Sequence, residues 1–199
     1  MADYYDITVV ATEEPVTLTE AKTWVRRGAV TADDTLLTSL ISAVTASDEK
    51  YCNRVFVTRT FEGFFDSLCA SRYESVPFIQ VRRAPIGAIS SVEVMSSDSW
   101  TAFTDYILKE TGGFPRILFP NGITDASPDS DVAYPLKVTF TAGYGAASAV
   151  PEDIKTAIKA HIAFLYENRG DTISEGSLGM PLEAKAIYNG KYQIINTFG

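Results

Sequence analysis

Histidine and cysteine, the residues that most often carry out chemistry in proteins, are nearly absent from this chain. Its 199 residues include one histidine and two cysteines. A histidine-activated nucleophile would have to use His161, which lies beside Ile162 in a predicted helix, so a place in the core or at the surface explains this residue better than catalysis. Two thiols and one imidazole also fall short of a four-coordinate metal site. We therefore expect no catalytic residue, no metal site and no cofactor.

Long apolar runs are also lacking. No stretch approaches the roughly 20 apolar residues that cross a bilayer, and the start, from Met1 to Asp6, is acidic where a signal peptide is basic. These features predict a protein that contacts no membrane and stays in the cytoplasm where it is made. Cys52 and Cys69 show no CxxC spacing, and in that reducing compartment both are expected to be free thiols.

Basic residues are outnumbered, with 17 Lys and Arg against 25 Asp and Glu and a formal net charge of -8. Tight binding to a phosphate backbone needs clustered cations, so specific nucleic-acid binding is not expected. An acidic wall could still surround DNA, because it repels the duplex and lets it slide. The pairs Arg26-Arg27 and Arg82-Arg83 are expected to be solvated or to form ion pairs between subunits.

Helices are predicted at both ends of the chain from their start signals and apolar spacing. Thr17 and Glu20 form a capping box, and Gly28 stands where this first helix is expected to end. Thr31 is the expected cap of the second helix, with Asp33 and Asp34 in its first turn. The predicted helices cover about residues 17–28, 31–52, 151–168 and 181–188, and the first two form a hairpin.

Strand-like segments fill the middle of the chain. They are rich in β-branched and aromatic residues and are separated by Pro, Gly, Ser and Asp. The expected strands lie within residues 55–65, 76–82, 89–95, 106–109, 116–119 and 136–141, and residues 141–145 form a turn. The aromatics Phe61, Phe64, Phe65 and Tyr73 are better explained by core packing than by base stacking, because few cations accompany them.

The predicted fold class is therefore α+β. A helical core is formed by residues 1–53 and 150–190, and an antiparallel β-rich insertion by residues 54–149. Residues 191–199 form a C-terminal tail of strand-like composition. We expect this tail to add as a strand to another subunit.

Four segments, taken together, resemble the head-tail connector (adaptor) family of tailed phages and gene-transfer agents, in its longer form with a β-rich insertion. They are residues 14–22 (EPVTLTEAK), 33–41 (DDTLLTSLI), 138–145 (VTFTAGYG) and 150–169, which begin VPEDIK and end YENR. Their order and spacing span residues 13 to 170. The chain departs from the family's pattern at its end, where it adds residues 191–199.

The resemblance implies a structural virion protein of the neck, made in the host bacterial cytoplasm, and not an enzyme. Its partners would be copies of itself in a dodecameric ring, the portal protein, and a stopper or tail-completion protein, with DNA passing through the channel without specific binding. The ring wall is expected in the two long helices, whose apolar faces carry Leu37, Ile41, Val44, Ile158, Ile162 and Leu165. Portal docking is assigned to the tail residues Tyr192, Ile194, Ile195 and Phe198.

Two other functions remain open from the sequence. One is a different neck or tail-completion protein with the same sheet-rich character. The other is a carbohydrate- or protein-binding β module flanked by helices, which aromatic residues on the surface of the insertion would favour. An enzyme is the weakest alternative.

Overall fold

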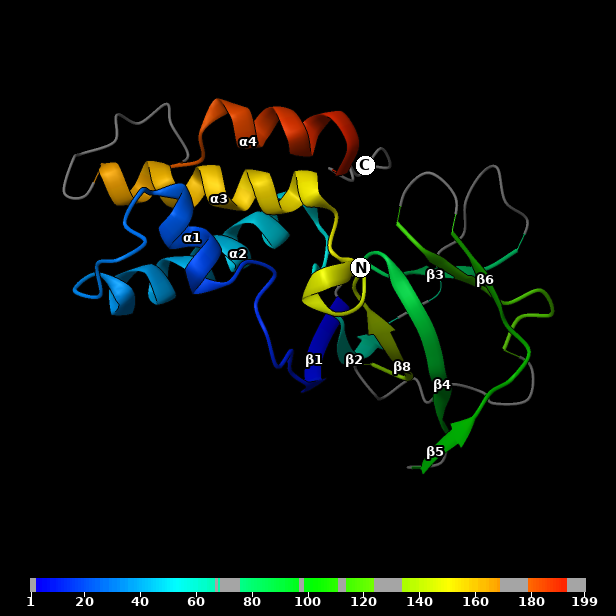
Figure 1. The fold of residues 1–199 in the computed structure, drawn as a ribbon. Helices are drawn as coiled ribbons and strands as arrows, with labels where there is room; N and C mark the ends of the chain where they lie inside the picture. Colours follow the sequence, from blue (N-terminus) through cyan, green and yellow to red (C-terminus); the bar gives the residue numbers. More distant parts are fainter. Residues whose placement is uncertain are drawn as a thin grey trace. The chain divides into compact units, whose positions relative to one another are not determined.

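The computed structural model describes residues 3–66, 68, 76–96, 99–110, 114–123, 134–168 and 179–192. Helices and antiparallel sheets are both present, which confirms the predicted α+β class (Figure 1). The chain divides into two compact units. Of the described residues, the sheet unit takes in the N-terminal strand and residues 58–143, and the helical unit takes in residues 12–57 and 144–192.

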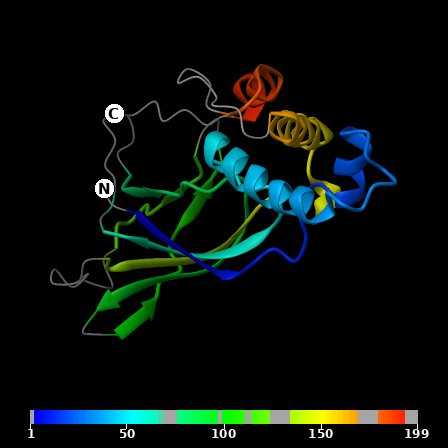
Figure 2. The same cartoon turned by 90° about the vertical axis from the view of Figure 1, so that its left-hand side faces the viewer.

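The helical unit is built around two long antiparallel helices. These are α2 (Asp34–Cys52) and α3 (Glu152–Glu167), and the short helices α1 (Leu18–Trp24) and α4 (Leu182–Ile187) pack against α3 (Figure 2). A 3-10 turn (Ala147–Ala149) precedes α3, and a π turn (Tyr188–Tyr192) continues α4. The core between α2 and α3 is aliphatic, because their apolar residues recur every three to four positions. Leu37, Ile41, Val44, Ile158 and Ile162 are buried there, while Leu165 is half-buried.

Helix α1 begins as its sequence predicts and ends earlier than expected. The Thr17 hydroxyl accepts a hydrogen bond from the Glu20 amide, and the Glu20 carboxylate accepts one from the Thr17 amide, which completes the capping box. The helix stops at Trp24, and Arg26 then takes a positive φ of 57°. The left-handed residue that reverses the chain is therefore Arg26 and not Gly28, an uncommon conformation for a residue with a side chain.

Helix α2 starts at Asp34, and the two acids expected in its first turn, Asp33 and Asp34, form tertiary contacts. Asp33 occupies the cap position without a side-chain cap bond, and its carboxylate accepts a hydrogen bond from the Tyr166 hydroxyl of α3 at 2.6 Å. Asp34 pairs with Lys22 of α1 at 2.7 Å. The predicted Thr31 cap was wrong. The start of α2 is determined instead by the contacts of these two acids with α1 and α3.

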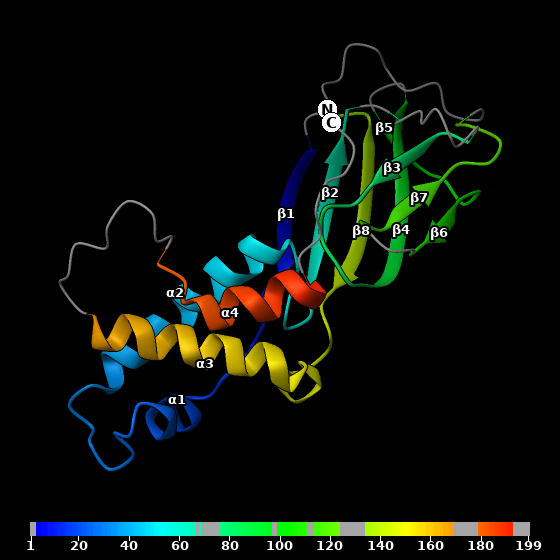
Figure 3. The same ribbon diagram turned by 90° about the horizontal axis from the view of Figure 1, so that it is seen from above.

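The sheet unit contains, among the described residues, a five-stranded antiparallel sheet in the order β1-β2-β8-β4-β5 (Figure 3). Its strands are β1 (Asp3–Val9), β2 (Arg59–Phe65), β8 (Leu136–Ala142), β4 (Ile86–Ser96) and β5 (Ser99–Ala102). A three-stranded sheet of β3 (Phe78–Gln80), β7 (Arg116–Leu118) and β6 (Ile107–Lys109) belongs to the same unit. Phe103, after β5, packs on Phe119, after β7, with ring centroids 5.7 Å apart, and so connects the two sheets.

Alternation along the strands decides which side chains are buried. On β2, Phe61 and Phe65 point into the core while Glu62 and Phe64 point to the opposite face. The same alternation holds on β8, where Leu136, Val138 and Phe140 are buried. The predicted turn after β8 is confirmed, with positive φ at Gly143 and Gly145.

Several predicted strand boundaries were wrong. Strands β1 and β5 were not expected. Val55 and Val57 precede β2 and belong to the helical unit, where the intervening Phe56 stacks on Tyr188. Lys191 and Tyr192, expected to start a strand-like tail, continue the helical turn after α4.

Candidate functional site

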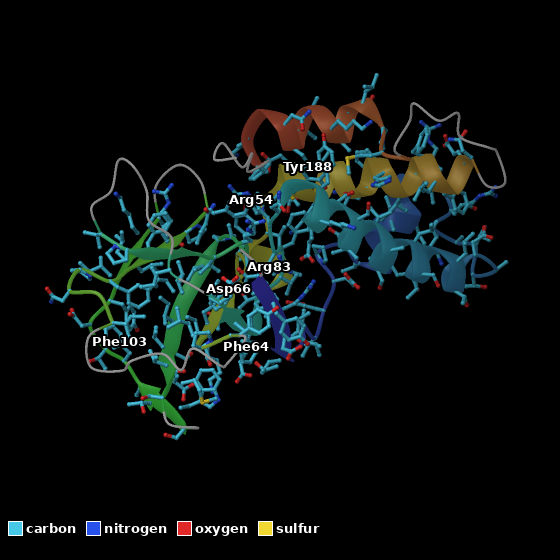
Figure 4. The ribbon with its side chains drawn as sticks, turned by 180° about the vertical axis from the view of Figure 1, so that it is seen from behind. Arg54, Phe64, Asp66, Arg83, Phe103 and Tyr188 are labelled. Carbon is cyan, nitrogen blue, oxygen red and sulfur yellow. The ribbon has the colours of Figure 1, made fainter. Side chains whose placement is uncertain are left out.

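The single histidine belongs to a buried hydrogen-bonded network in the helical unit. Asp48 of α2 has no solvent exposure, and His161 of α3 is 4% exposed. The His161 Nδ1 atom lies 2.8 Å from Asp48 Oδ1, and the Tyr188 hydroxyl donates to Asp48 Oδ2 at 2.7 Å. Burial, together with the Asp48 carboxylate, raises the pKa of Tyr188, so its hydroxyl remains a donor. The network connects α2, α3 and the turn after α4, which begins at Tyr188. Tyr188 is labelled in Figure 4.

This network offers no reactive nucleophile. The Cys52 thiol follows one helical turn after Asp48, donates to the Asp48 carbonyl oxygen, and is buried. Burial raises the pKa of the Cys52 thiol to about 12, which leaves almost no thiolate at neutral pH. Among the described residues no group of three His, Cys, Asp or Glu side chains is placed to hold a metal ion. The geometry is that of a polar core contact that holds three helices in register.

The turn after α4 is held by a second set of polar contacts, in which Tyr192 is central. Its hydroxyl donates to both carboxylate oxygens of Asp153 at 2.6 and 2.7 Å, and its carbonyl oxygen accepts a hydrogen bond from Arg54 Nε at 2.7 Å. Lys191 pairs with the same carboxylate at 3.1 Å. Partial burial raises the pKa of Asp153, but the hydrogen bonds from Tyr192 and Lys191 lower it by more. The pKa of Asp153 is therefore lower than that of an ordinary aspartate.

We expect Tyr192→Phe to lower the free energy of unfolding by about 1 kcal/mol, since it removes the hydroxyl and keeps the ring. The lowered pKa of Asp153 contributes stability that is present above the pKa of an unfolded aspartate and is lost as the pH falls through the folded value. The variant should therefore lose less stability than the parent on acidification. Urea denaturation at pH 7 and at pH 3 measures both effects. An equal loss on acidification in the two proteins would contradict this contact.

The face of the five-stranded sheet opposite the core carries a row of aromatic rings. Tyr4, Phe64 and Lys137 are directly opposed on β1, β2 and β8. Tyr4 packs on Phe64 with centroids 6.0 Å apart, and Phe64 packs on Trp100 of β5 at 6.3 Å. The Lys137 ammonium lies 4.7 Å from the Trp100 centroid and pairs with Glu93 at 2.8 Å. Because the rings pack on one another and Lys137 covers Trp100, little flat ring surface is left for stacking a ligand.

Beside this row, two carboxylates oppose each other without a cation. Asp6 of β1 and Glu62 of β2 are register partners, and like charges in that position repel. The Tyr4 hydroxyl donates to Asp6 at 2.6 Å. The Glu62 side chain forms no hydrogen bond or ion pair with any other described residue. This part of the sheet face is therefore an uncompensated acidic site.

The helical unit carries a basic and aromatic surface at the end of α1. Trp24, the last residue of α1, is 45% exposed. A groove there is lined by Thr19, Glu20, Thr23, Trp24, Arg26 and Lys159. The Lys159 ammonium lies 5.4 Å from the Trp24 centroid, a cation–π contact. Arg26 and Arg27 are exposed, and their side chains have no partner among the described residues.

The residues predicted to form functional surfaces fall into two groups. Those assigned to the ring wall lie on α2 and α3, and all but the half-buried Leu165 are buried in the chain's own core. Of those assigned to portal docking, Tyr192 is buried in the helical unit, and Ile194, Ile195 and Phe198 lie outside the described residues. Among the described residues no helix is long and apolar enough to span a membrane.

Sequence reasoning singled out the Arg26-Arg27 pair of the basic surface but missed the exposed Trp24 beside it, and it missed the acidic surface altogether. The signal for the acidic one was the alternation of Tyr4, Asp6 and Thr8 with the more apolar Tyr5, Ile7 and Val9, which indicates a strand with two different faces. The signal for the basic one was a tryptophan followed closely by two arginines. Tryptophan and arginine are the residue types most enriched at the energetic centres of protein interfaces.

Comparison with known proteins gives matches among solved structures. A chain of the neck of an empty GTA particle, computed with C6 symmetry, matches with a TM-score of 0.76 and 19% identity over 98% of each chain. A chain of the virion of a native gene transfer agent (GTA) particle matches with a TM-score of 0.73 and 20% identity, over 98% of this chain and 97% of that one. A chain of the neck of a native GTA particle, computed with C12 symmetry, matches with a TM-score of 0.63 and 20% identity over 98% of each chain. No protein-family model matches the chain, and no curated protein matches it either. At this identity the likeness establishes a shared fold.

Proposed function

We propose that this chain is a structural connector of the neck of a tailed phage or gene-transfer-agent particle. It forms a ring between the portal protein and a stopper or tail-completion protein, and the ring surrounds the channel through which DNA passes. The observation that most supports this proposal is that chains of GTA necks share the fold over 98% of their length and of this one, helical unit and sheet unit together. Four sequence segments that resemble the connector family point the same way.

The chemistry of the described residues is consistent with mechanical joining. The one histidine is bonded to Asp48 in a buried network, and the Cys52 thiol is buried and protonated. The net charge of -8 suits a channel that DNA must slide through without sticking. A ring with one subunit type needs two different complementary patches on each copy, and the exposed basic and acidic surfaces offer such a pair.

The C-terminal tail is the portal-docking segment in this proposal, with Ile194, Ile195 and Phe198 as its apolar anchors. Tyr192, the last described residue of the tail, is anchored to the helical unit, because its side chain is buried and bonded to Asp153. A truncation that tests docking must therefore keep Tyr188 and Tyr192 and remove only residues 193–199.

The test is to mix the purified chain with the portal protein of the same particle and image the mixture by electron microscopy. We expect a ring coaxial with the portal, formed by the full chain. The truncated chain should bind the portal about tenfold or more weakly, a loss of at least one anchor contact, and keep its thermal unfolding midpoint. A full chain that forms no ring and binds no portal would refute the proposed function. Undiminished binding by the truncated chain would refute only the role of the tail.

A carbohydrate- or protein-binding β module is the second candidate, because the sheet face carries Tyr4, Phe64 and Trp100 side by side. The packing of these rings on one another, with Lys137 over Trp100, favours a structural role for the row. Saturable binding of a soluble oligosaccharide, lost in Trp100→Ala, would reverse this preference.

A further inference from the structure

We propose that neighbouring copies of this chain join through a charged contact between two different surfaces. The basic surface, formed by Trp24, Arg26, Arg27 and Lys159 of one copy, meets the acidic surface, formed by Asp6 and Glu62 of the next. This inference rests on the proposed ring and specifies how the ring is held together.

The basic surface has the composition and geometry of an interface site. It combines a large exposed aromatic side chain, a groove beside it, and arginines whose side chains are unpaired among the described residues. Arg26 stands in the left-handed region, with φ of 57°, which costs free energy for a residue with a side chain. Arg27 follows directly, so both arginines lie on one exposed turn. The chain has a net charge of -8, so these unpaired cations give this surface a charge opposite to that of the chain as a whole.

The acidic surface differs from the other described carboxylates because its two charges oppose each other and are not paired with a cation. Described carboxylates elsewhere commonly accept a hydrogen bond or pair with a cation, as Glu93 does with Lys137 and Asp34 with Lys22. Glu167 and Glu183 also lack a partner among the described residues, but they lie on helices and do not oppose a second carboxylate across paired strands. Only at Asp6 and Glu62 do two described carboxylates oppose each other across paired strands with no cation bonded to either. Cations from outside the chain would relieve that repulsion.

A second copy is the occupant that the charges favour. Every copy carries both surfaces, so each contact leaves one basic and one acidic surface free for the next copies, which is the condition for a ring. Complementary charges on the two surfaces also exclude contacts between like surfaces, because basic against basic and acidic against acidic repel. Duplex DNA is the competing occupant of the basic surface, and the experiment separates the two.

Charge reversal tests the contact on the full chain. Arg26→Glu with Arg27→Glu makes both surfaces of a copy acidic, and Asp6→Lys with Glu62→Lys makes both basic. Each variant alone should form at least roughly tenfold fewer rings than the parent at equal concentration, since each contact then sets like charges against each other. An equimolar mixture should recover rings, because copies of the two kinds alternate with opposite charges at every contact. A variant that carries all four substitutions should also form rings, because its two surfaces again have opposite charges.

The matched control is Lys50→Glu with Lys185→Glu, which reverses two charges of the same helical unit outside the basic surface. Ring yield is counted by electron microscopy with portal present, and by native mass spectrometry. Recovery in the mixture together with normal rings in the control supports the contact. Rings formed equally by all variants would overturn the inference and leave the proposed function standing, whereas a parent chain that forms no rings would overturn both. Loss of duplex DNA binding in Arg26→Glu with Arg27→Glu, with rings unchanged, would assign the basic surface to DNA and overturn the inference.

Discussion

Replacing Asp48 with alanine is expected to lower the free energy of unfolding by about 3–5 kcal/mol, because it removes the shared acceptor of a buried network. The Tyr188 hydroxyl and the His161 ring nitrogen, both bonded to Asp48, would be left without a partner in a site that solvent does not reach. The thermal midpoint should fall by about 10 °C, and the urea midpoint should fall with it. Both can be followed by circular dichroism at 222 nm, which reports the helices.

Two milder replacements separate the parts of this network. Tyr188→Phe keeps the ring that stacks on Phe56 and removes one hydrogen bond, so its loss should be about 1–2 kcal/mol. Asp48→Asn keeps the shape and an acceptor oxygen for Tyr188 while removing the charge. A loss below about 1 kcal/mol in Asp48→Ala would mean that the network does not hold the helices together, and its hydrogen bonds would need another explanation.

The network could not have been predicted as a unit from the sequence. Its members lie on three separate predicted helices: Asp48, His161 and Tyr188. Helical spacing predicts on which face of its own helix each residue lies, but not which faces pack against one another. His161 was expected in the core or at the surface, and it lies buried against Asp48. Its bonding partners required the tertiary structure.

The α+β class followed from local signals that tertiary packing did not override. The capping box of Thr17 and Glu20 and the proline-led start of α3 act within one turn of helix, so the sequence alone predicts them. The start of α2 depends on contacts of Asp33 and Asp34 with other helices, and its predicted cap was wrong. Strand β1 was missed because its partner β2 lies some 50 residues further along the chain.

The exposed surfaces were harder to predict than the core for a similar reason. Apolar spacing counts Trp24 with the buried face of α1, but the helix ends at that residue and its side chain remains 45% exposed. Asp6 and Glu62 become neighbours only when β1 pairs with β2. The proposed contact between copies depends on such juxtapositions, which the sequence pattern alone does not predict.

Replacing Phe65 with alanine is expected to lower the free energy of unfolding by about 3–5 kcal/mol, the cost of removing a large aromatic side chain from a packed core. Phe65 has no solvent exposure, and it meets Tyr5 edge to face with ring centroids 5.9 Å apart. The cavity left behind is bordered by strands of one sheet, whose hydrogen bonds limit how far it can collapse. Urea denaturation followed by aromatic fluorescence measures the loss.

Phe64→Ala is the matched control, since it removes the same atoms from the preceding residue of the same strand. Phe64 lies on the opposite face, half-buried against Tyr4 and Trp100, so only about 1 kcal/mol should be lost. Equal losses in the two variants would mean that both faces of β2 are equally buried. The face with Asp6 and Glu62 would then be closed to any second copy. A large difference between neighbours leaves that face free, as a contact between copies requires, because alternation sends Glu62 and Phe64 to the same side.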